Sequence, residues 1–505
     1  MTLALGIGAA AAIFTLLQQV MLRSLPVVQA GQLWRLGDAA RCCYSDGYAQ
    51  NNWNLFSWEA YKHFRVGALA FEHLAAFQIG EGNAQLAVRR AGSPAPVGEY
   101  VSGNFFETLG ISAWRGRALT DADDQAGAPP VAVMSFHTWE RKYGSDPSVV
   151  GAAYQVNGHA FTVIGIAPPG FFGVKIADSD MPDFWLPLAT EPVIARATSR
   201  LNNPRLAWLD LIGRIRPGTN VKTLEAHLQV ELHQWLASHV ADMTSQERAL
   251  LQKQTLHLTP GGAGVSLMRE SYKDALWLLL MAAISVLLVA CANVANLLLA
   301  RCLRNRQQTA LRAALGASLS HLVRYPLAES LTLALLGAIA GIGVAYAGAR
   351  LIFYLAFTGP ETWVPLDPAP STSALLFALG IALITGVLFG VAPAWMASGA
   401  EPIEALRRGN RSLGRNHRWA QKTLVIVQVA VSLVLLSAAA MLGQSLRNRE
   451  HQNFGFDING RICSRSIRKF PTTNRSNWRP SFEISRTICA PFAVCGPRAP
   501  YSRRR

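Results

Sequence analysis

The sequence predicts a helical membrane protein with a large mixed α/β domain inserted outside the membrane. Of the 505 residues, 50% are hydrophobic and 15% are charged, whereas charged residues form about a quarter of an ordinary soluble domain. Several stretches are long and apolar enough to cross a bilayer. The longest interval between two of them carries the alternating patterns and turn signals of a folded α/β domain.

Five stretches contain about 20 or more predominantly apolar residues, the length that crosses a bilayer. The first could instead be a secretory signal peptide, since Val28 and Ala30 would suit cleavage after Ala30. No basic residue precedes the apolar run, which favours a retained membrane helix. The start at Met1 also raises the expectation of a preceding cytoplasmic segment. The predicted membrane helices cover residues 2–22, 275–300, 327–355, 374–398 and 423–446.

Basic residues predict the orientation of these helices. Two connections, between helices two and three and between helices four and five, are rich in arginine, whereas residues 357–371 contain no Lys or Arg. Basic loops stay in the cytoplasm, so residues 25–270 are expected on the outer, periplasmic face. The flanking basic residues are Arg301, Arg304, Arg306, Arg312, Arg324, Arg407, Arg408, Arg411, Arg415, Arg418 and Lys422.

Residues 25–270 have the patterns of a mixed α/β domain. Asn157-Gly158 lies between two β-prone runs, which predicts a tight hairpin. Residues 131–134 are strand-like and follow an acidic turn, while 135–143 and 222–240 have helical spacing of apolar residues.

Sequence motifs for catalysis, cofactor binding or metal binding are missing from the sequence. It contains no GxxxxGK[ST] phosphate loop, no HExxH and no GxSxG. The seven cysteines include no CxxC pair, so we expect no metal site and no disulfide scaffold. The net charge of +16 is spread along membrane flanks rather than over one aromatic-rich domain, which argues against nucleic-acid binding. We therefore predict no catalytic, cofactor-binding or metal-binding residues.

Polar and small residues within the apolar stretches are the candidates for helix packing. Asn293 and Asn296 share one face of helix two, either as an interhelical hydrogen-bonding pair or as wetted residues near its cytoplasmic end. Glu329, in the first turn of helix three, could pair with an arginine or simply favour the positive end of the helix dipole. Two GxxxG pairs predict close packing of backbones: Gly337 with Gly341, and Gly386 with Gly390.

The arginine-rich connection after helix two predicts a short amphipathic helix along the membrane. Its apolar stripe and its basic residues fall on different sides of a helix. Such a segment could bind lipid headgroups or dock a cytoplasmic protein. The candidate docking residues are Arg304, Arg306, Leu311, Arg312, Ala314, Leu315 and Gly316.

With these motifs, residues 1–457 resemble the MacB/FtsX-type permeases of ABC transporters, in particular the group with a duplicated unit. The matching stretches are Leu3–Ala9, Val101–Gly110, Gly116–Leu119, Phe161–Gly165, Arg312–Ala317 and Pro402–Arg407. The resemblance implies four membrane helices around a periplasmic core domain inserted after the first helix. It also implies a separate cytoplasmic ATPase that docks near residues 304–317, a location in the bacterial inner membrane and a homodimer. The cargo, a peptide, lipid, lipoprotein or drug, is left open.

The expected domain organisation follows from these assignments. The last segment, rich in Arg, Ser and Pro, lacks a folding pattern, so we expect either a disordered basic tail or an aberrant, frame-shifted end of a truncated second unit. Two alternatives to transport also stand: a membrane-anchored sensor or scaffold, and a non-functional fragment. The expected parts are helix one (1–24), the outer core domain (25–270), the FtsX-like module (271–400), a basic linker (401–422), helix five (423–446) and the outer tail (447–505).

Overall fold

A computed structural model describes most of the chain outside the two arginine-rich connections and the C-terminal tail. The predicted amphipathic docking segment and the tail therefore lie outside the described residues, as does Asn157 of the predicted hairpin. Side chains are described for most of the same positions. The described residues are 1–22, 24–38, 45–67, 70–79, 88–89, 98–156, 158–176, 181–304, 319–356, 369, 371–398 and 415–450.

All five predicted membrane helices are present as long helices. Four contain spans that satisfy the length and apolarity needed to cross a membrane, and α11 is apolar over Thr372–Ile384 within its described side chains. α8 and α13 are longer than their apolar stretches because polar, helix-favouring flanks continue them beyond the span. The helices are α1 (Thr2–Leu17, continued by a π-helical turn, Gln18–Leu22), α8 (Leu267–Arg304), α10 (Leu319–Ala356), α11 (Thr372–Ser398) and α13 (Arg415–Glu450).

Within the described residues, one 11-stranded mixed sheet organises the outer domain. The strand order is β14-β1-β13-β3-β5-β11-β7-β9-β8-β4, with β6 paired to β9. The strands are β1 (Leu33–Leu36), β3 (Phe71–Gln78), β4 (Val88–Arg89), β5 (Gly98–Val101), β6 (Arg115–Gly116), β7 (Val131–Met134), β8 (Ala153–Val156), β9 (His159–Ile166), β11 (Phe184–Pro187), β13 (Leu209–Ile215) and β14 (Leu258–Pro260).

Two short two-stranded sheets accompany the main one. β2 (Ser45–Asp46) pairs with β12 (Leu206–Ala207), and β10 (Lys175–Ile176) pairs in parallel with β15 (Val265–Ser266). The predicted hairpin is confirmed as the antiparallel pair β8 and β9, with Gly158 in the left-handed region at φ 85°.

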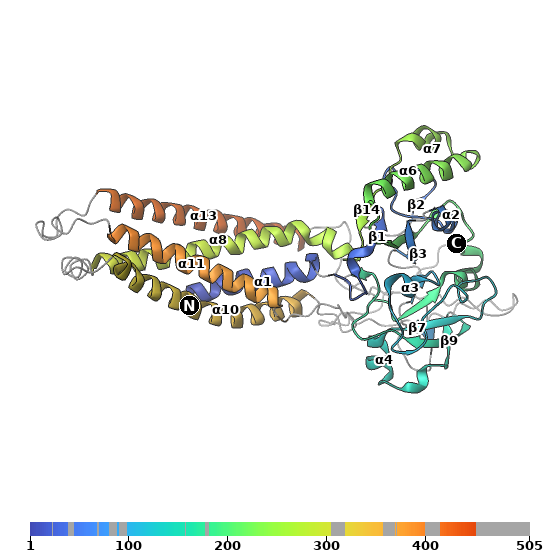
Figure 1. Cartoon of the computed structure of the whole chain (residues 1–505), viewed down its shortest axis with the longest axis horizontal. Coiled ribbons are helices and arrows are strands. Elements are labelled where there is room, and N and C mark those ends of the chain that lie inside the picture. Colours follow the sequence, from blue (N-terminus) through green and yellow to red (C-terminus); the bar gives the residue numbers. More distant parts are fainter. Residues whose placement is uncertain are drawn as a thin grey trace, which may run out of the picture. The chain divides into compact units, whose positions relative to one another are not determined.

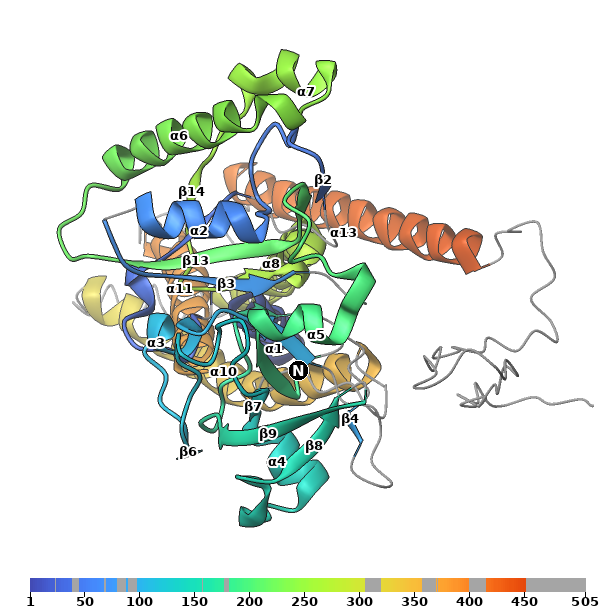
Figure 2. The same ribbon diagram turned by 90° about the vertical axis from the view of Figure 1, so that its right-hand side faces the viewer.

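Short helices cover both faces of this sheet. Figure 2 shows α2 and α6 on one side of β13 and β3, with α3 on the other. The cap of α6 is Asn220, whose side chain accepts hydrogen bonds from the Lys222 and Thr223 amides. The helices are α2 (Trp58–Gly67), α3 (Phe105–Leu109), α4 (Phe136–Tyr143), α5 (Glu191–Ala195), α6 (Val221–Ser238) and α7 (Ser245–Leu250), and the 3-10 turns are Ala30–Gln32, Pro147–Val149, Leu188–Thr190, Arg196–Thr198, Val240–Asp242 and Leu251–Lys253.

The strand β13 shows how the sheet separates two cores. Leu209 and Leu211 point into the core beneath α2 and α6. Ile212, on the opposite face, packs in a second core that also contains residues from the membrane helices. Because successive side chains of a strand alternate between faces, β13 belongs to both cores at once.

Candidate functional site

The membrane helices α1, α8, α10 and α11 pack through small residues. Figure 1 shows these four helices running side by side. A Cβ atom on Gly8 of α1 would lie 2.8 Å from the Gly341 carbonyl oxygen of α10, and one on Gly337 would lie 3.2 Å from Leu3 Cβ. Helix backbones can approach this closely only where side chains are absent or small.

The centre of this bundle is lined mainly by alanines. Ala11 and Ala12 of α1, with Ala338 of α10 and Ala378 of α11, are buried in one cluster with Leu287 of α8. α1 also contacts α11 through Phe14 and Phe377, whose stacked rings have centroids 4.1 Å apart. The bundle is therefore packed closely by small residues rather than held apart by large ones.

The polar residues predicted within the helices have distinct surroundings. Asn293 Oδ1 accepts a hydrogen bond of 2.7 Å from Gln428 Nε2 of α13. Asn296 is half-buried on α8. Glu329 is half-buried in α10, and its main-chain carbonyl accepts a hydrogen bond from the Thr332 hydroxyl.

The surroundings of the other predicted site residues lie mostly outside the described part of the chain. Arg304 is the last residue of α8, and Gly386 and Gly390 fall in α11, at positions whose side-chain surroundings lie outside the described part. Arg306, Leu311, Arg312, Ala314, Leu315 and Gly316 lie outside the described residues altogether.

The second core continues from the outer domain onto the outer ends of α1 and α8. Leu17 and Val20 at the end of α1, and Leu276 and Leu280 of α8, belong to the same buried cluster as Ile212 of the sheet. Burying a large aliphatic side chain stabilises a fold by about 1.5–3 kcal/mol. The helix ends and the sheet face are thus parts of one apolar core.

Polar contacts reinforce this junction. Arg269, in the first turn of α8, donates a hydrogen bond of 3.4 Å from Nε to the Val20 carbonyl. Ser371, before α11, donates its hydroxyl to Gln18 Oε1 in the π-helical turn. π-helical turns are uncommon and often mark functional positions. The turn at Gln18–Leu22 therefore lies where α1, α8 and α11 meet the outer domain.

Charged groups are buried on the sheet face above this junction. Asp210 of β13 is 1% exposed and lies 3.9 Å from the Arg35 guanidinium. Burial raises the pKa of Asp210 to about 7, although Arg35 and Lys175 act in the opposite direction. Lys175 Nζ lies 2.7 Å from Glu99 Oε1. Sequence reasoning missed this cluster, whose one visible signal is the presence of acidic and basic residues inside strand-like apolar runs.

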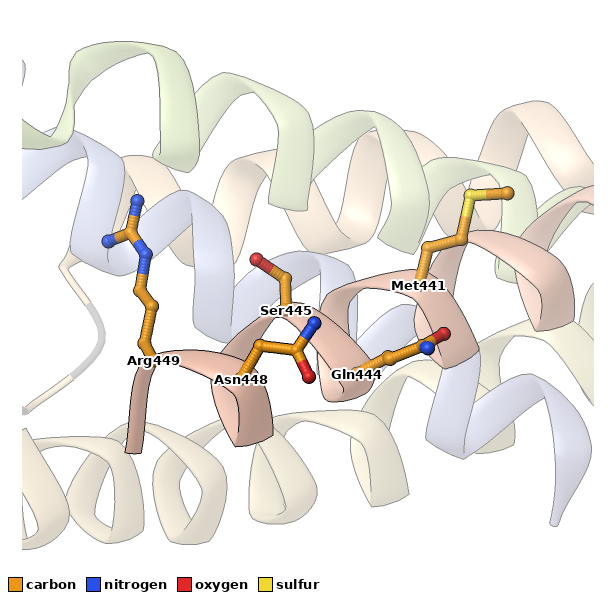
Figure 3. A pocket seen from close by; sticks show the side chains of 5 residues that line it. All are labelled: Met441, Gln444, Ser445, Asn448 and Arg449. Carbon is orange, nitrogen blue, oxygen red and sulfur yellow. The ribbon is translucent and has the colours of Figure 1, made fainter. Parts of the chain in front are cut away.

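The described residues contain no group of three or more His, Cys, Asp or Glu side chains placed to hold a metal ion. An open depression runs along the end of α13, lined by Met441, Gln444, Ser445, Asn448 and Arg449 (Figure 3). All five side chains come from successive turns of one helix, so the depression is a surface of that helix and not an enclosed binding site.

The chain matches two domain families. Residues 1–230 match the model of the MacB-like periplasmic core domain, and residues 280–402 match that of the FtsX-like permease C-terminal domain. The chain is therefore a multi-pass membrane protein with a periplasmic α/β domain. It combines the MacB-like periplasmic core domain with the FtsX-like permease domain, the two domains that the resemblance to MacB/FtsX-type permeases predicted.

Curated relatives agree with this assignment. The probable syringafactin export ATP-binding/permease protein SyfD of Pseudomonas syringae pv. tomato is 27% identical over 311 residues, or 61% of this chain and 41% of the relative. The macrolide export ATP-binding/permease protein MacB of Salmonella paratyphi A is 26% identical over 329 residues, or 65% of this chain and 44% of the relative. The chain thus spans about two fifths of the length of these relatives.

Two solved structures overlap the chain at low similarity. The periplasmic region of MacB from Actinobacillus actinomycetemcomitans covers 52% of this chain and 97% of its own, with 10% identity and a TM-score of 0.32. A domain of a putative permease protein from Porphyromonas gingivalis covers 46% of this chain and 92% of its own, with 16% identity and a TM-score of 0.30.

Proposed function

We propose that this chain is the permease subunit of an ABC transporter in the bacterial inner membrane. It couples ATP hydrolysis by a separate cytoplasmic ATPase to movement of its periplasmic domain. That movement exports or extracts a cargo. The sequence contains no phosphate-binding loop of the GxxxxGK[ST] type, and the proposal assigns nucleotide binding to the partner.

The core shared by the helix ends and the sheet is the observation that carries this proposal. Leu17 and Leu276 come from different membrane helices, yet both are buried with Ile212 on the face of the sheet. A packed core transmits displacement because its side chains interdigitate with few voids. A shift of α1 relative to α8 would therefore repack the face of the outer domain.

The ATPase would act at the opposite, cytoplasmic side of the membrane. We assign docking to residues 304–317, where the sequence predicts an apolar stripe containing Leu311 and Leu315 beside basic residues. ATP binding and hydrolysis would bias two arrangements of the helices, and the outer domain would respond to that change. Such coupling is a two-state element biased from a distant site.

The test uses the full chain, purified with each candidate ATPase encoded beside it. Stimulation of ATP hydrolysis by the permease is measured for wild type, Leu315→Asp and Gly316→Pro. We expect stimulation with one ATPase, and its loss in both variants. Leu413→Asp makes the same charge change in the other arginine-rich connection and serves as the matched control, which should keep stimulation.

Two outcomes would overturn the proposal. One is that no ATPase binds the permease, which would favour the sensor or scaffold alternative. The other is that the Leu315 and Gly316 variants stimulate hydrolysis as well as wild type does, which would remove the docking assignment.

A further inference from the structure

The chain passes between the membrane helices and the outer domain at two points, and these points are hydrogen-bonded together. The amide of Leu25, after α1, donates to the Gly262 carbonyl at 2.8 Å. The returning segment, residues 261–266, then pairs through β15 with β10, and Val265 is opposite Lys175. Ser266, the last residue of β15, is followed directly by Leu267, the first residue of α8.

A glycine fixes the path of this returning segment, which we call the strap (residues 261–266). Gly264 has φ +70°, and a Cβ atom there would lie 2.4 Å from the Val174 carbonyl oxygen. Only glycine adopts this backbone conformation readily at such close approach. The position of the strap against β10 is therefore well defined.

The Lys175 side chain extends from β10 to the centre of the main sheet. Its Nζ lies 2.7 Å from Glu99 Oε1 of β5 and donates a 2.6 Å hydrogen bond to the Gln78 carbonyl at the end of β3. The Trp185 indole donates to the other Glu99 oxygen at 3.1 Å. Glu99 is 4% exposed and Lys175 19%, so water hardly screens this ion pair.

We infer that Lys175 links the start of α8 to the central strands β3 and β5 and keeps their relative positions fixed. Its backbone is paired with the strap that enters α8, and its ammonium group is held by Glu99. A displacement of α8 along its axis is thereby passed to the sheet. Lys175 is a positioning residue, and this inference rests on the coupling proposed above.

The alternative is that the pair merely stabilises the domain. A buried ion pair often adds little net stability, while loss of one partner leaves an uncompensated charge. The two roles differ in where the effect appears. If Lys175 links α8 to the sheet, loss of the pair loosens the strap and the first turn of α8. If the pair is purely stabilising, its loss destabilises the whole domain.

Amide hydrogen exchange of the full chain in lipid nanodiscs separates these roles and needs no ATPase. In Lys175→Met we expect exchange at the Val265 amide to accelerate about tenfold or more, as in a local opening, while amides of β13 stay near wild type. The conservative variant Lys175→Arg keeps a positive donor for Glu99 and for the Gln78 carbonyl, and should keep slow exchange at Val265. It also guards against a single variant that fails to fold.

Lys142→Met is the matched control. It breaks a pair of similar length, with Lys142 Nζ of α4 2.8 Å from a buried Asp183 oxygen. It should leave Val265 unchanged. Uniform acceleration across the sheet in Lys175→Met, or no change at Val265, would overturn the inference. Failure of ATPase stimulation would instead count against the proposed function alone.

Discussion

Gly8 of α1 and Gly341 of α10 bring two membrane helices into backbone contact. A Cβ atom on Gly8 would lie 2.7 Å from Val344 Cβ and 2.8 Å from the Gly341 carbonyl oxygen. Gly341 is the second glycine of a GxxxG pair, and its own Cβ would lie 3.3 Å from the Gly8 amide nitrogen. The two glycines therefore set the separation of the helices.

Substitution of Gly8 by alanine should destabilise the bundle. The added methyl group meets backbone as well as a β-branched side chain, neither of which can rotate away, and overpacking of this kind costs about 1–3 kcal/mol. We expect a lower thermal unfolding midpoint for the full chain in detergent. Gly343→Ala is the control, because a Cβ atom at Gly343 of α10 has nothing within 4 Å. Equal midpoints for the two variants would contradict the packing argument.

The bond between Asn293 and Gln428 should hold α13 against α8. In lipid each amide otherwise lacks a partner, although measured interhelical hydrogen bonds average only about 0.6 kcal/mol. We expect Asn293→Leu and Gln428→Leu each to reduce disulfide cross-linking between cysteines placed on α8 and α13, with the double variant no worse than either single one. Gln444→Leu is the control on the same helix. Additive losses in the double variant would mean that the two residues act separately.

The sequence alone was sufficient to predict the membrane helices, because a helix that crosses lipid needs a long apolar segment whatever it later contacts. The hairpin at Gly158 was also predictable from local sequence, because Asn-Gly between two β-prone runs is itself a turn signal. The pair formed by Lys175 and Glu99 was not predictable, since these residues are far apart in the chain and meet only because the fold brings the Lys175 side chain from β10 to Glu99 of β5. The burial of Asp210 was not predictable either, because β13 is buried on both faces and its pattern does not show which side chains face the membrane helices.

Glu247 should stabilise the outer domain above its unfolded pKa of 4.5. Burial alone would raise the pKa of this carboxyl, but hydrogen bonds from the Thr244 and Tyr48 amides and from Arg205 outweigh it and lower the pKa to about 2. The stabilisation is thus complete above pH 4.5 and is lost as the pH falls towards 2.

The variant Glu247→Gln should reduce stability at pH 7 by roughly 1.5–3 kcal/mol, the usual range for hydrogen bonds to a charged group. Thermal unfolding of the full chain, followed by tryptophan fluorescence, should show the gap from wild type closing as the pH falls from 5 to about 2. The exposed Glu140, changed to Gln, provides the control. A gap that stays constant with pH would show that the charge of Glu247 is not responsible.

Asp210 should give the opposite pH dependence. Burial raises its pKa from 3.8 to about 7, so the folded domain favours the neutral acid. Its contribution to stability is greatest below pH 3.8 and declines as the pH rises through 7. Asp210→Asn mimics the neutral form, and we expect it to match wild type at pH 4 and to exceed it at pH 8 in thermal unfolding. A variant profile that falls as steeply as that of wild type between these values would place the titration elsewhere.

The orientation can be tested by labelling single cysteines in a background from which the seven native cysteines have been removed. Ala160, exposed on β9, should react as cysteine with a membrane-impermeant maleimide once the outer membrane is permeabilised, because the outer domain faces the periplasm. A cysteine at Asn410, in the arginine-rich connection that the positive-inside rule places in the cytoplasm, should react only after the inner membrane is opened. The reverse pattern would invert the topology, and it would remove the cytoplasmic docking segment on which the coupling proposal depends.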